Sequence, residues 1–195
     1  MPKKDLTEII VVLDRSGSMF SIKADMDGAF DSFVAEQRKL PGQATLTLVQ
    51  FDDVCEQVYG SKPLSDVPPM ALTPRGSTAL YDAIGKTISE TGARLKGLPE
   101  AERPERVLFL VITDGHENAS REYTQPRIAE MVKHQTDKYS WCFVYLGANQ
   151  DAVMTGKGIG IGIAENFAAN SVGTKSLMAN VSHSTRSYRG GKGYV

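Results

Sequence analysis

The chain of 195 residues is long enough for one domain with a sizeable core, since a chain near this length buries roughly 70% of the surface that its unfolded form exposes. Hydrophobic residues make up 41% of the chain and charged residues 23%, which is ordinary globular composition and excludes wholesale disorder. The formal net charge of -1 excludes a bulk electrostatic attraction to nucleic acid or membranes. We therefore expect a single globular domain over residues 1–195 that binds neither.

Cysteine usage and the N-terminal segment predict a cytoplasmic protein. Cys55 and Cys142 lie in apolar, strand-like contexts and are expected to be free thiols. The apolar run at residues 9–13 is too short for the core of a signal peptide and ends in an aspartate. No stretch of the sequence reaches the roughly 20 apolar residues of a membrane span.

Continuous apolar runs predict strands that are covered on both faces of a sheet. These runs cover residues 9–13, 107–112 and 141–146. Residues 44–51 predict a further strand, and residues 54–59 its antiparallel hairpin partner at the sheet edge. A last short strand is predicted over residues 163–167.

Amphipathic helices are predicted between these strands and after the last one. Their apolar faces are marked by Ile22, Met26, Phe30, Phe33 and Val34, then by Leu80, Ala83, Ile84, Thr87, Ile88, Thr91 and Leu95, then by Ile128, Met131 and Val132, and finally by Leu177, Val181 and Tyr188. The glycine-dense segment 156–162 predicts a loop, and residues 189–193 predict a frayed tail. Strands that alternate with helices predict a doubly wound α/β fold, with a mostly parallel six-stranded sheet, one antiparallel edge strand and helices on both faces.

Oxygen-bearing side chains gather in the loops where such a fold binds ligands, beyond the carboxyl ends of the strands. The loop after the first strand holds Asp14, Ser16 and Ser18. Thr78 precedes the second helix, and Asp114 follows the strand at residues 107–112. Each of these residues alone could cap a helix or form a turn. If the first and fourth strands are neighbours, all five oxygens converge, and carboxylates with hydroxyls suit Mg²⁺ or Mn²⁺.

Three motifs in these loops resemble a known family. The motifs are Leu13-Asp14-Arg15-Ser16-Gly17-Ser18-Met19, Gly76-Ser77-Thr78-Ala79-Leu80 and Thr113-Asp114-Gly115. In order and separation they resemble the metal-ion-dependent adhesion site (MIDAS) of von Willebrand factor A (VWA) domains. The resemblance runs from about Asp5 to Gly147 and more weakly to Phe167, leaving a C-terminal helix and tail over 168–195. It is greatest to the compact, bacterial-type intracellular members, and the site matches the family pattern completely.

The resemblance implies a role for each of the five residues. Ser16 and Ser18 would coordinate Mg²⁺ directly, whereas Asp14 and Asp114 would do so directly or through water. Thr78 would join the metal when a ligand is bound. Mn²⁺ or Ca²⁺ could replace Mg²⁺. The family further implies a free metal position that is completed by an Asp or Glu carboxylate of a partner protein.

Intracellular relatives commonly work beside AAA-type ATPases, kinases or phosphatases, which implies an adaptor or subunit of an intracellular assembly. Two other functions stay open. One is a metal-dependent hydrolase of phosphate or carboxyl esters, although no general base or nucleophile is evident beside the oxygen set, so no catalytic residue is expected. Asp14 also resembles the nucleophile of haloacid-dehalogenase-type phosphatases, but Ser16 stands where their second carboxylate is needed. The other is a structural subunit whose metal only rigidifies the loops.

Several polar residues near these loops have no assigned role. Three of them, His116, Glu117 and Asn118, flank the predicted pocket and could shape partner preference. Asp52 and Asp53 either lean toward the same rim or form an ordinary hairpin turn. Near the C-terminus, Arg186, Arg189 and Lys192 predict a solvated helix end rather than a nucleic-acid patch.

Overall fold

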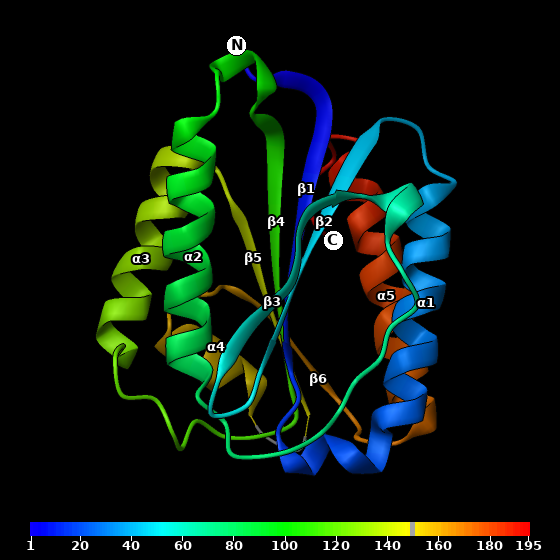
Figure 1. Ribbon diagram of the computed structural model, residues 1–195, viewed down its shortest axis with the longest axis vertical. Helices are drawn as coiled ribbons and strands as arrows, with labels where there is room; N and C mark the ends of the chain where they lie inside the picture. Colours follow the sequence, from blue (N-terminus) through cyan, green and yellow to red (C-terminus); the bar gives the residue numbers. More distant parts are fainter. Residues whose placement is uncertain (149–150) are drawn as a thin grey trace.

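A mostly parallel, six-stranded sheet forms the centre of the molecule, in the order β3-β2-β1-β4-β5-β6 (Figure 1). This computed structural model describes residues 1–148 and 151–195. The strands are β1 (Lys3–Asp14), β2 (Gln43–Phe51), β3 (Cys55–Pro63), β4 (Pro104–Thr113), β5 (Cys142–Ala148) and β6 (Ile163–Phe167). All neighbouring pairs are parallel except β2 and β3, which confirms the predicted antiparallel edge strand.

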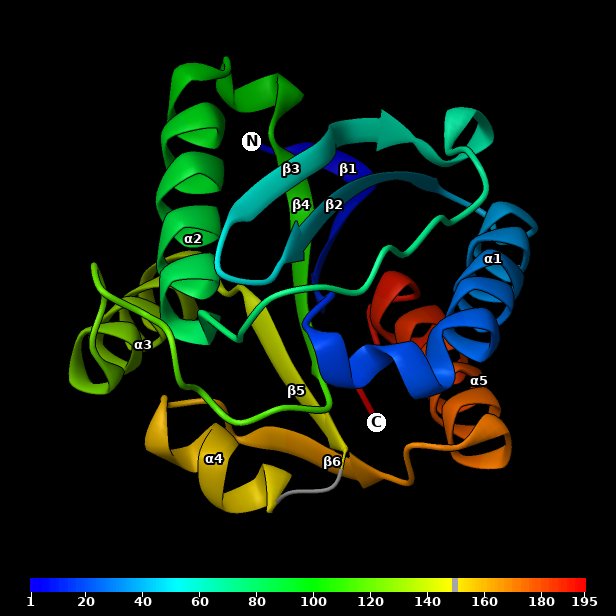
Figure 2. The same ribbon diagram turned by 60° about the horizontal axis from the view of Figure 1, so that its bottom comes forward.

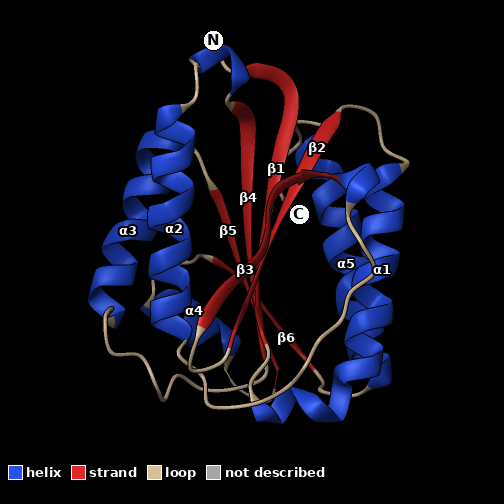
Figure 3. Cartoon of the chain, viewed as in Figure 1, coloured by secondary structure: helices blue, strands red, loops and turns tan. Residues whose placement is uncertain are grey.

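Helices cover both faces of the sheet (Figure 3). α1 (Lys23–Arg38) and α5 (Ser171–Arg189) pack against one face, and α2 (Leu80–Gly97), α3 (Gln125–Tyr139) and α4 (Ala152–Gly158) against the other. Side chains of a strand alternate between its two faces, so Ile9 and Val11 of β1 enter the first core and Ile10 and Val12 the second. Both faces of β1 are buried, and this is why its sequence is a continuous apolar run rather than an alternating one. The predicted doubly wound fold is confirmed.

The strand order reverses between β1 and β4. The chain moves outward from β1 to β2 and β3 and then returns to place β4 on the other side of β1. After β1 the chain turns toward α1 on one face, and after β4 it turns toward α3 on the other, so the two loops diverge at the carboxyl edge. Figure 2 brings this edge forward. A crevice between diverging loops is where open α/β sheets bind ligands.

Two predictions about the C-terminal part of the chain were wrong. Residues 156–158, predicted as part of a loop over 156–162, are the end of α4, whereas residues 159–162 do lie outside any helix or strand. The Asp151 carboxylate accepts a hydrogen bond from the N–H of Met154 at the start of α4. Gly156 in this helix permits close packing against β6, because a Cβ at this position would stand only 3.0 Å from the Cβ of Ala164. The tail is held as well, since the Ser184 hydroxyl donates to the carbonyl of Val195 and Tyr194 packs against the core.

The structure bears on two expectations, that the cysteines are free thiols and that no segment spans a membrane. Cys55 and Cys142 are free thiols, as predicted, and each is half-buried. Within residues 1–148 and 151–195, no helix has the length and apolar character needed to cross a membrane.

Candidate metal centre

Two hydrogen bonds hold the carboxylate of Asp14 in place at the end of β1. It ends β1 fully buried, where its Oδ1 accepts a hydrogen bond from the N–H of Ser16 at 2.6 Å and its Oδ2 accepts one from the Thr113 hydroxyl at 2.5 Å. Burial raises the pKa of Asp14 to about 6, because a dry environment penalises the charged carboxylate. The hydrogen bonds oppose this rise, and the nearby charge of Asp114 adds to it. Asp14 is therefore an anchored carboxylate that forms no ion pair within residues 1–148 and 151–195.

The first and third motifs meet directly. The Ser18 hydroxyl donates a hydrogen bond to Oδ1 of Asp114 at 2.6 Å, although the two residues are 96 positions apart in the chain. The Oγ atoms of Ser16 and Ser18 lie 3.2 Å from each other. Burial also raises the pKa of Asp114, and the hydrogen bond from Ser18 opposes that rise. This contact exists because β1 and β4 are neighbours in the sheet, which was the condition for the predicted convergence of the oxygens.

Thr78 comes from the loop that precedes α2 and is held by Asn118. The N–H of Thr78 donates to Oδ1 of Asn118 at 2.9 Å, and the N–H of Asn118 donates to the carbonyl of Thr78 at 3.1 Å. Glu117 accepts a hydrogen bond from the N–H of Tyr81 in the first turn of α2 at 3.0 Å. Two of the three residues expected to flank the pocket thus position the Thr78 loop, while His116 is exposed.

Oxygens of the first and second motifs surround one small space beside Gly115 of the third motif. A Cβ built on Gly115 would stand 3.0 Å from Oγ1 of Thr78, 3.6 Å from Oδ2 of Asp14 and 3.7 Å from Oγ of Ser16. Glycine keeps this space free of side-chain atoms. Carboxylate and hydroxyl oxygens are the donors that hard divalent cations prefer, so the residues around this space suit such an ion. Across residues 1–148 and 151–195, no three His, Cys, Asp or Glu side chains gather as a metal site, so any metal here depends on the hydroxyls.

Asp52 joins the loops of the first and second motifs, a role that the sequence did not reveal. Its buried Oδ2 accepts hydrogen bonds from Nε of Arg15 at 2.9 Å and from Nε of Arg75 at 2.7 Å. Burial acts to raise the pKa of Asp52, but hydrogen bonds from Arg75, Val54 and Arg15 outweigh it and hold the pKa below its usual value. The position of an aspartate at the end of β2, next to two arginine-bearing loops, is the only sequence signal for this network.

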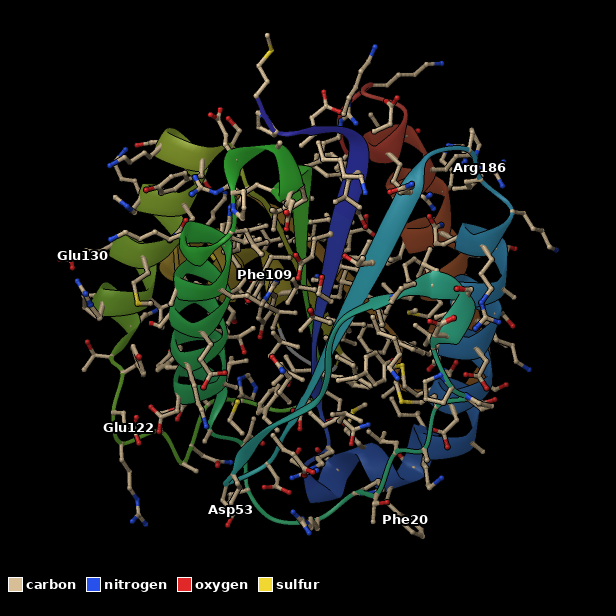
Figure 4. The ribbon with its side chains drawn as sticks, turned by 45° about the horizontal axis from the view of Figure 1, so that its top comes forward. Phe20, Asp53, Phe109, Glu122, Glu130 and Arg186 are labelled. Carbon is tan, nitrogen blue, oxygen red and sulfur yellow. The ribbon has the colours of Figure 1, made fainter. Side chains whose placement is uncertain are left out.

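Backbone hydrogen bonds reinforce the same junction. The N–H of Arg75 donates to the carbonyl of Arg15 at 2.8 Å, and the N–H of Gly17 donates to the carbonyl of Gly76 at 3.2 Å. Gly76 has a φ of +68°, and a Cβ there would stand 2.1 Å from Oδ1 of Asp53, so only glycine fits. Asp53 itself is exposed at the tip of the β2–β3 hairpin (Figure 4). Of the two aspartates in the turn, Asp52 therefore bonds the two loops together, while the exposed Asp53 lies against Gly76 of the second motif.

Similarity to known proteins is visible in the fold and not in the sequence. No family model and no curated protein matches the chain. Among solved structures, the pilus adhesin SpaC from Lactobacillus rhamnosus GG is 13% identical with a TM-score of 0.69, over 96% of this chain and 31% of that one. A von Willebrand factor type A protein from Catenulispora acidiphila is 14% identical with a TM-score of 0.61, over 92% of this chain and 42% of that one.

A third structure contains a metal. Proximal thread matrix protein 1 from the mussel byssus, with zinc in its MIDAS motif, is 18% identical with a TM-score of 0.62. The match covers 92% of this chain and 46% of the mussel chain. The chain thus spans less than half the length of each of these three proteins. At such low identity the likeness shows the fold alone, and that fold is the one found in VWA domains.

Proposed function

We propose that this chain is a metal-dependent protein-interaction module of the VWA type, in which Asp14, Ser16, Ser18, Thr78 and Asp114 hold a divalent cation. The proposal rests on the convergence of their oxygens around the space beside Gly115. The zinc-occupied MIDAS of the mussel protein supports a metal at this place in the fold. Mg²⁺ is the ion we expect, with Mn²⁺ or Ca²⁺ as alternatives, because all five donors are hard oxygens.

The composition of the donor set favours capture of an acidic partner. Three of the five donors are neutral hydroxyls, so two carboxylates contribute all the negative charge. A bound ion would supply a positive centre that attracts a further carboxylate. We therefore propose that an Asp or Glu of a partner protein completes the site. The chain would act in the cytoplasm as an adaptor or subunit of an assembly, and AAA-type ATPases, kinases and phosphatases are candidate partners by family analogy.

Binding is favoured over hydrolysis by the contacts of Glu117, the carboxylate that follows Asp114 in the same loop. Its two oxygens accept four hydrogen bonds, from the N–H groups of Tyr81, Ala119 and Ser120 and from the Ser120 hydroxyl. A carboxylate occupied in this way holds the loop and is not free to activate a water molecule. We propose that the chain is not an enzyme and has no catalytic residue.

Affinity capture from a lysate, with and without chelator, tests the function. Thr78→Ala should weaken partner capture by more than it weakens Mg²⁺ binding, because in the family its hydroxyl joins the metal only in the ligand-bound state. Ser16→Ala should weaken both, by about ten- to a hundredfold in Mg²⁺ affinity, since an unsatisfied contact to a charged group costs roughly 1.5–3 kcal/mol. Ser32→Ala, which removes an exposed hydroxyl of α1, is the matched control and should change neither.

Two results would contradict the proposal. Undiminished Mg²⁺ binding by both Asp14→Ala and Ser16→Ala in calorimetry would remove the site assignment. Metal-dependent turnover of a phosphate ester that disappears in Asp14→Ala would instead establish the hydrolase.

A further inference from the structure

A second pocket lies at the amino end of the strands, away from the metal centre. Its volume is about 460 Å³, and the start of β1, the turn between α1 and β2, Arg106 of β4 and the end of α5 line it. Figure 4 shows Arg186 at the opposite end of the molecule from Phe20 and Asp53, which lie at the carboxyl edge of the sheet. None of the five residues of the proposed metal centre lines this pocket.

The lining of this pocket is strongly cationic. Arg106, Arg186, Arg189 and Lys192 line it, against a single carboxylate, that of Asp5. This excess is local, because the whole chain has a formal net charge of only -1. The sequence showed three of these cations as a mildly basic helix end, but it could not show that the fold adds Arg106 and a concave surface.

Arg189 builds one wall of the pocket. Its Nη1 donates to the carbonyl of Gln37 at 2.7 Å, and its Nη2 donates to the carbonyls of Pro41 at 3.3 Å and Gly42 at 3.2 Å. These bonds fix the end of α5 against the turn that follows α1. Arg189 is therefore occupied by the fold and leaves the other three cations to face a ligand.

Those three cations keep donors to spare. In the part of the chain that the structure describes, the side chains of Arg186 and Lys192 have no hydrogen-bond or ion-pair partner. Arg106 makes one ion pair, from Nη1 to Oε2 of Glu105 at 2.9 Å, and Glu105 also accepts a hydrogen bond from the N–H of Asp5. Glu105 thus balances part of the charge of Arg106, while Arg186 and Lys192 form no ion pair within the described residues.

The tail after α5 folds back and lies against Arg106. The N–H of Lys192 donates to the carbonyl of Ser187 at 3.0 Å, which turns the chain back after α5. A Cβ on Gly191, whose φ is +77°, would stand 3.3 Å from Nη2 of Arg106, so the tail lies directly against this guanidinium. The Tyr188 hydroxyl donates to the carbonyl of Val107 at 3.0 Å and anchors the end of the helix to β4.

We propose that this pocket binds a small molecule that carries a phosphate or pyrophosphate group. Guanidinium groups match phosphate oxygens with paired N–H donors, and a lysine adds a point charge. The volume falls within the range of roughly 300–1,000 Å³ that small-molecule sites occupy. A nucleic-acid backbone would instead need an extended basic stripe, whereas these cations surround a single concavity. The space exceeds that of one phosphate group, so pyrophosphate should bind more tightly than phosphate.

Calorimetric titration with sodium pyrophosphate and with inorganic phosphate tests the proposal. The protein is first stripped of metal and then returned to a chelator-free buffer, so that neither a bound cation nor the chelator competes for the anion. We expect saturable binding at one site in about 0.1 M salt, where long-range attraction is largely screened. Arg186→Gln and Lys192→Gln should each weaken it about tenfold, from the loss of one charge-assisted contact. Arg121→Gln and Lys157→Gln are matched controls, since both side chains are exposed and lie outside this pocket.

The comparison between the two pairs of variants decides the outcome. Selective loss in Arg186→Gln and Lys192→Gln, with the controls unchanged, supports the site. An equal loss in all four variants would show a general effect of net charge and would overturn the proposal. Absence of saturable binding of both anions by the unsubstituted chain would overturn it too. Because no metal is present, each result is independent of the proposed metal centre.

Discussion

Replacing Gly115 with alanine would place a methyl group inside the proposed metal site. The new carbon would stand 3.0 Å from Oγ1 of Thr78, 3.6 Å from Oδ2 of Asp14 and 3.7 Å from Oγ of Ser16. Mg²⁺ binds its oxygen ligands at about 2.0–2.1 Å, so the methyl group would fill space that an ion needs in order to reach these oxygens together. At least one contact to the ion would be lost.

The expected loss in Mg²⁺ affinity is about ten- to a hundredfold, because a contact to a charged group contributes roughly 1.5–3 kcal/mol. The fold should survive this change. Gly115 does not have a positive φ, and only the contact with Thr78 is tighter than ordinary packing. A compatible Gly→Ala change stabilises by roughly 0.4–1 kcal/mol, which offsets the tight contact. The melting temperature without metal should stay within about 4 °C, on the basis of roughly 2–4 °C per kcal/mol for a chain of this size.

Calorimetry with Mg²⁺ and thermal unfolding in chelator measure the two quantities separately. Gly28→Ala is the matched control, because a Cβ on Gly28 in α1 would meet no atom within 4 Å. It should raise stability by roughly 0.4–1 kcal/mol and leave Mg²⁺ binding unchanged. Wild-type Mg²⁺ affinity in Gly115→Ala would refute the reasoning, because the three oxygens could not then enclose the ion.

Three further predictions concern the groups that support the site. Because the pKa of Asp14 is raised to about 6, Mg²⁺ affinity should fall as pH is lowered through 6, which titration calorimetry measures. In the metal-free protein, the stability that protonated Asp14 gives the fold should be lost as pH rises through 6, which unfolding at several pH values measures. Asp14→Asn should abolish this pH dependence of stability. Asp52→Asn should destabilise the fold by about 1.5–3 kcal/mol in denaturant unfolding, since the buried guanidinium of Arg15 loses its charged contact to Asp52 and keeps only the one to Glu56; loss below 1 kcal/mol would contradict the role given to this residue. Asn118→Ala removes the side-chain half of the pair of hydrogen bonds that holds the backbone of Thr78 and should weaken Mg²⁺ binding severalfold, whereas Asn118→Asp, which keeps the accepting oxygen, should restore most of it; equal affinities would show that Thr78 does not need this support.

The sequence alone predicted a mostly parallel sheet with one antiparallel edge strand, and it predicted that five oxygens meet at its edge if the first and fourth strands are neighbours. Continuous apolar runs mark strands buried on both faces because covering helices leave no polar side, and the order of elements then limits the topology to a few arrangements. Asp14 and Asp114 end or follow such runs, so their place at the carboxyl edge follows from strand direction. The contact between Ser18 and Asp114 required only that β1 and β4 be neighbours.

Only the tertiary structure decided how these residues are supported and what the C-terminal segment does. Asp52 pairs with two arginines, and Asn118 forms a hydrogen bond with Thr78, across separations of 23 to 40 residues in the chain. No local sequence pattern encodes these contacts. The glycines near residue 156 predicted a loop because glycine has a low intrinsic helix propensity. In the structure, Gly156 is helical, and its small size allows α4 to pack closely against β6. Likewise, the arginines of α5 look like a solvated helix end in the sequence, since only the folded tail and Arg106 of β4 bring them around one pocket. Side-chain periodicity is a property of consecutive residues and can be read directly, but charge pairing and close packing depend on which distant segments the completed fold places in contact.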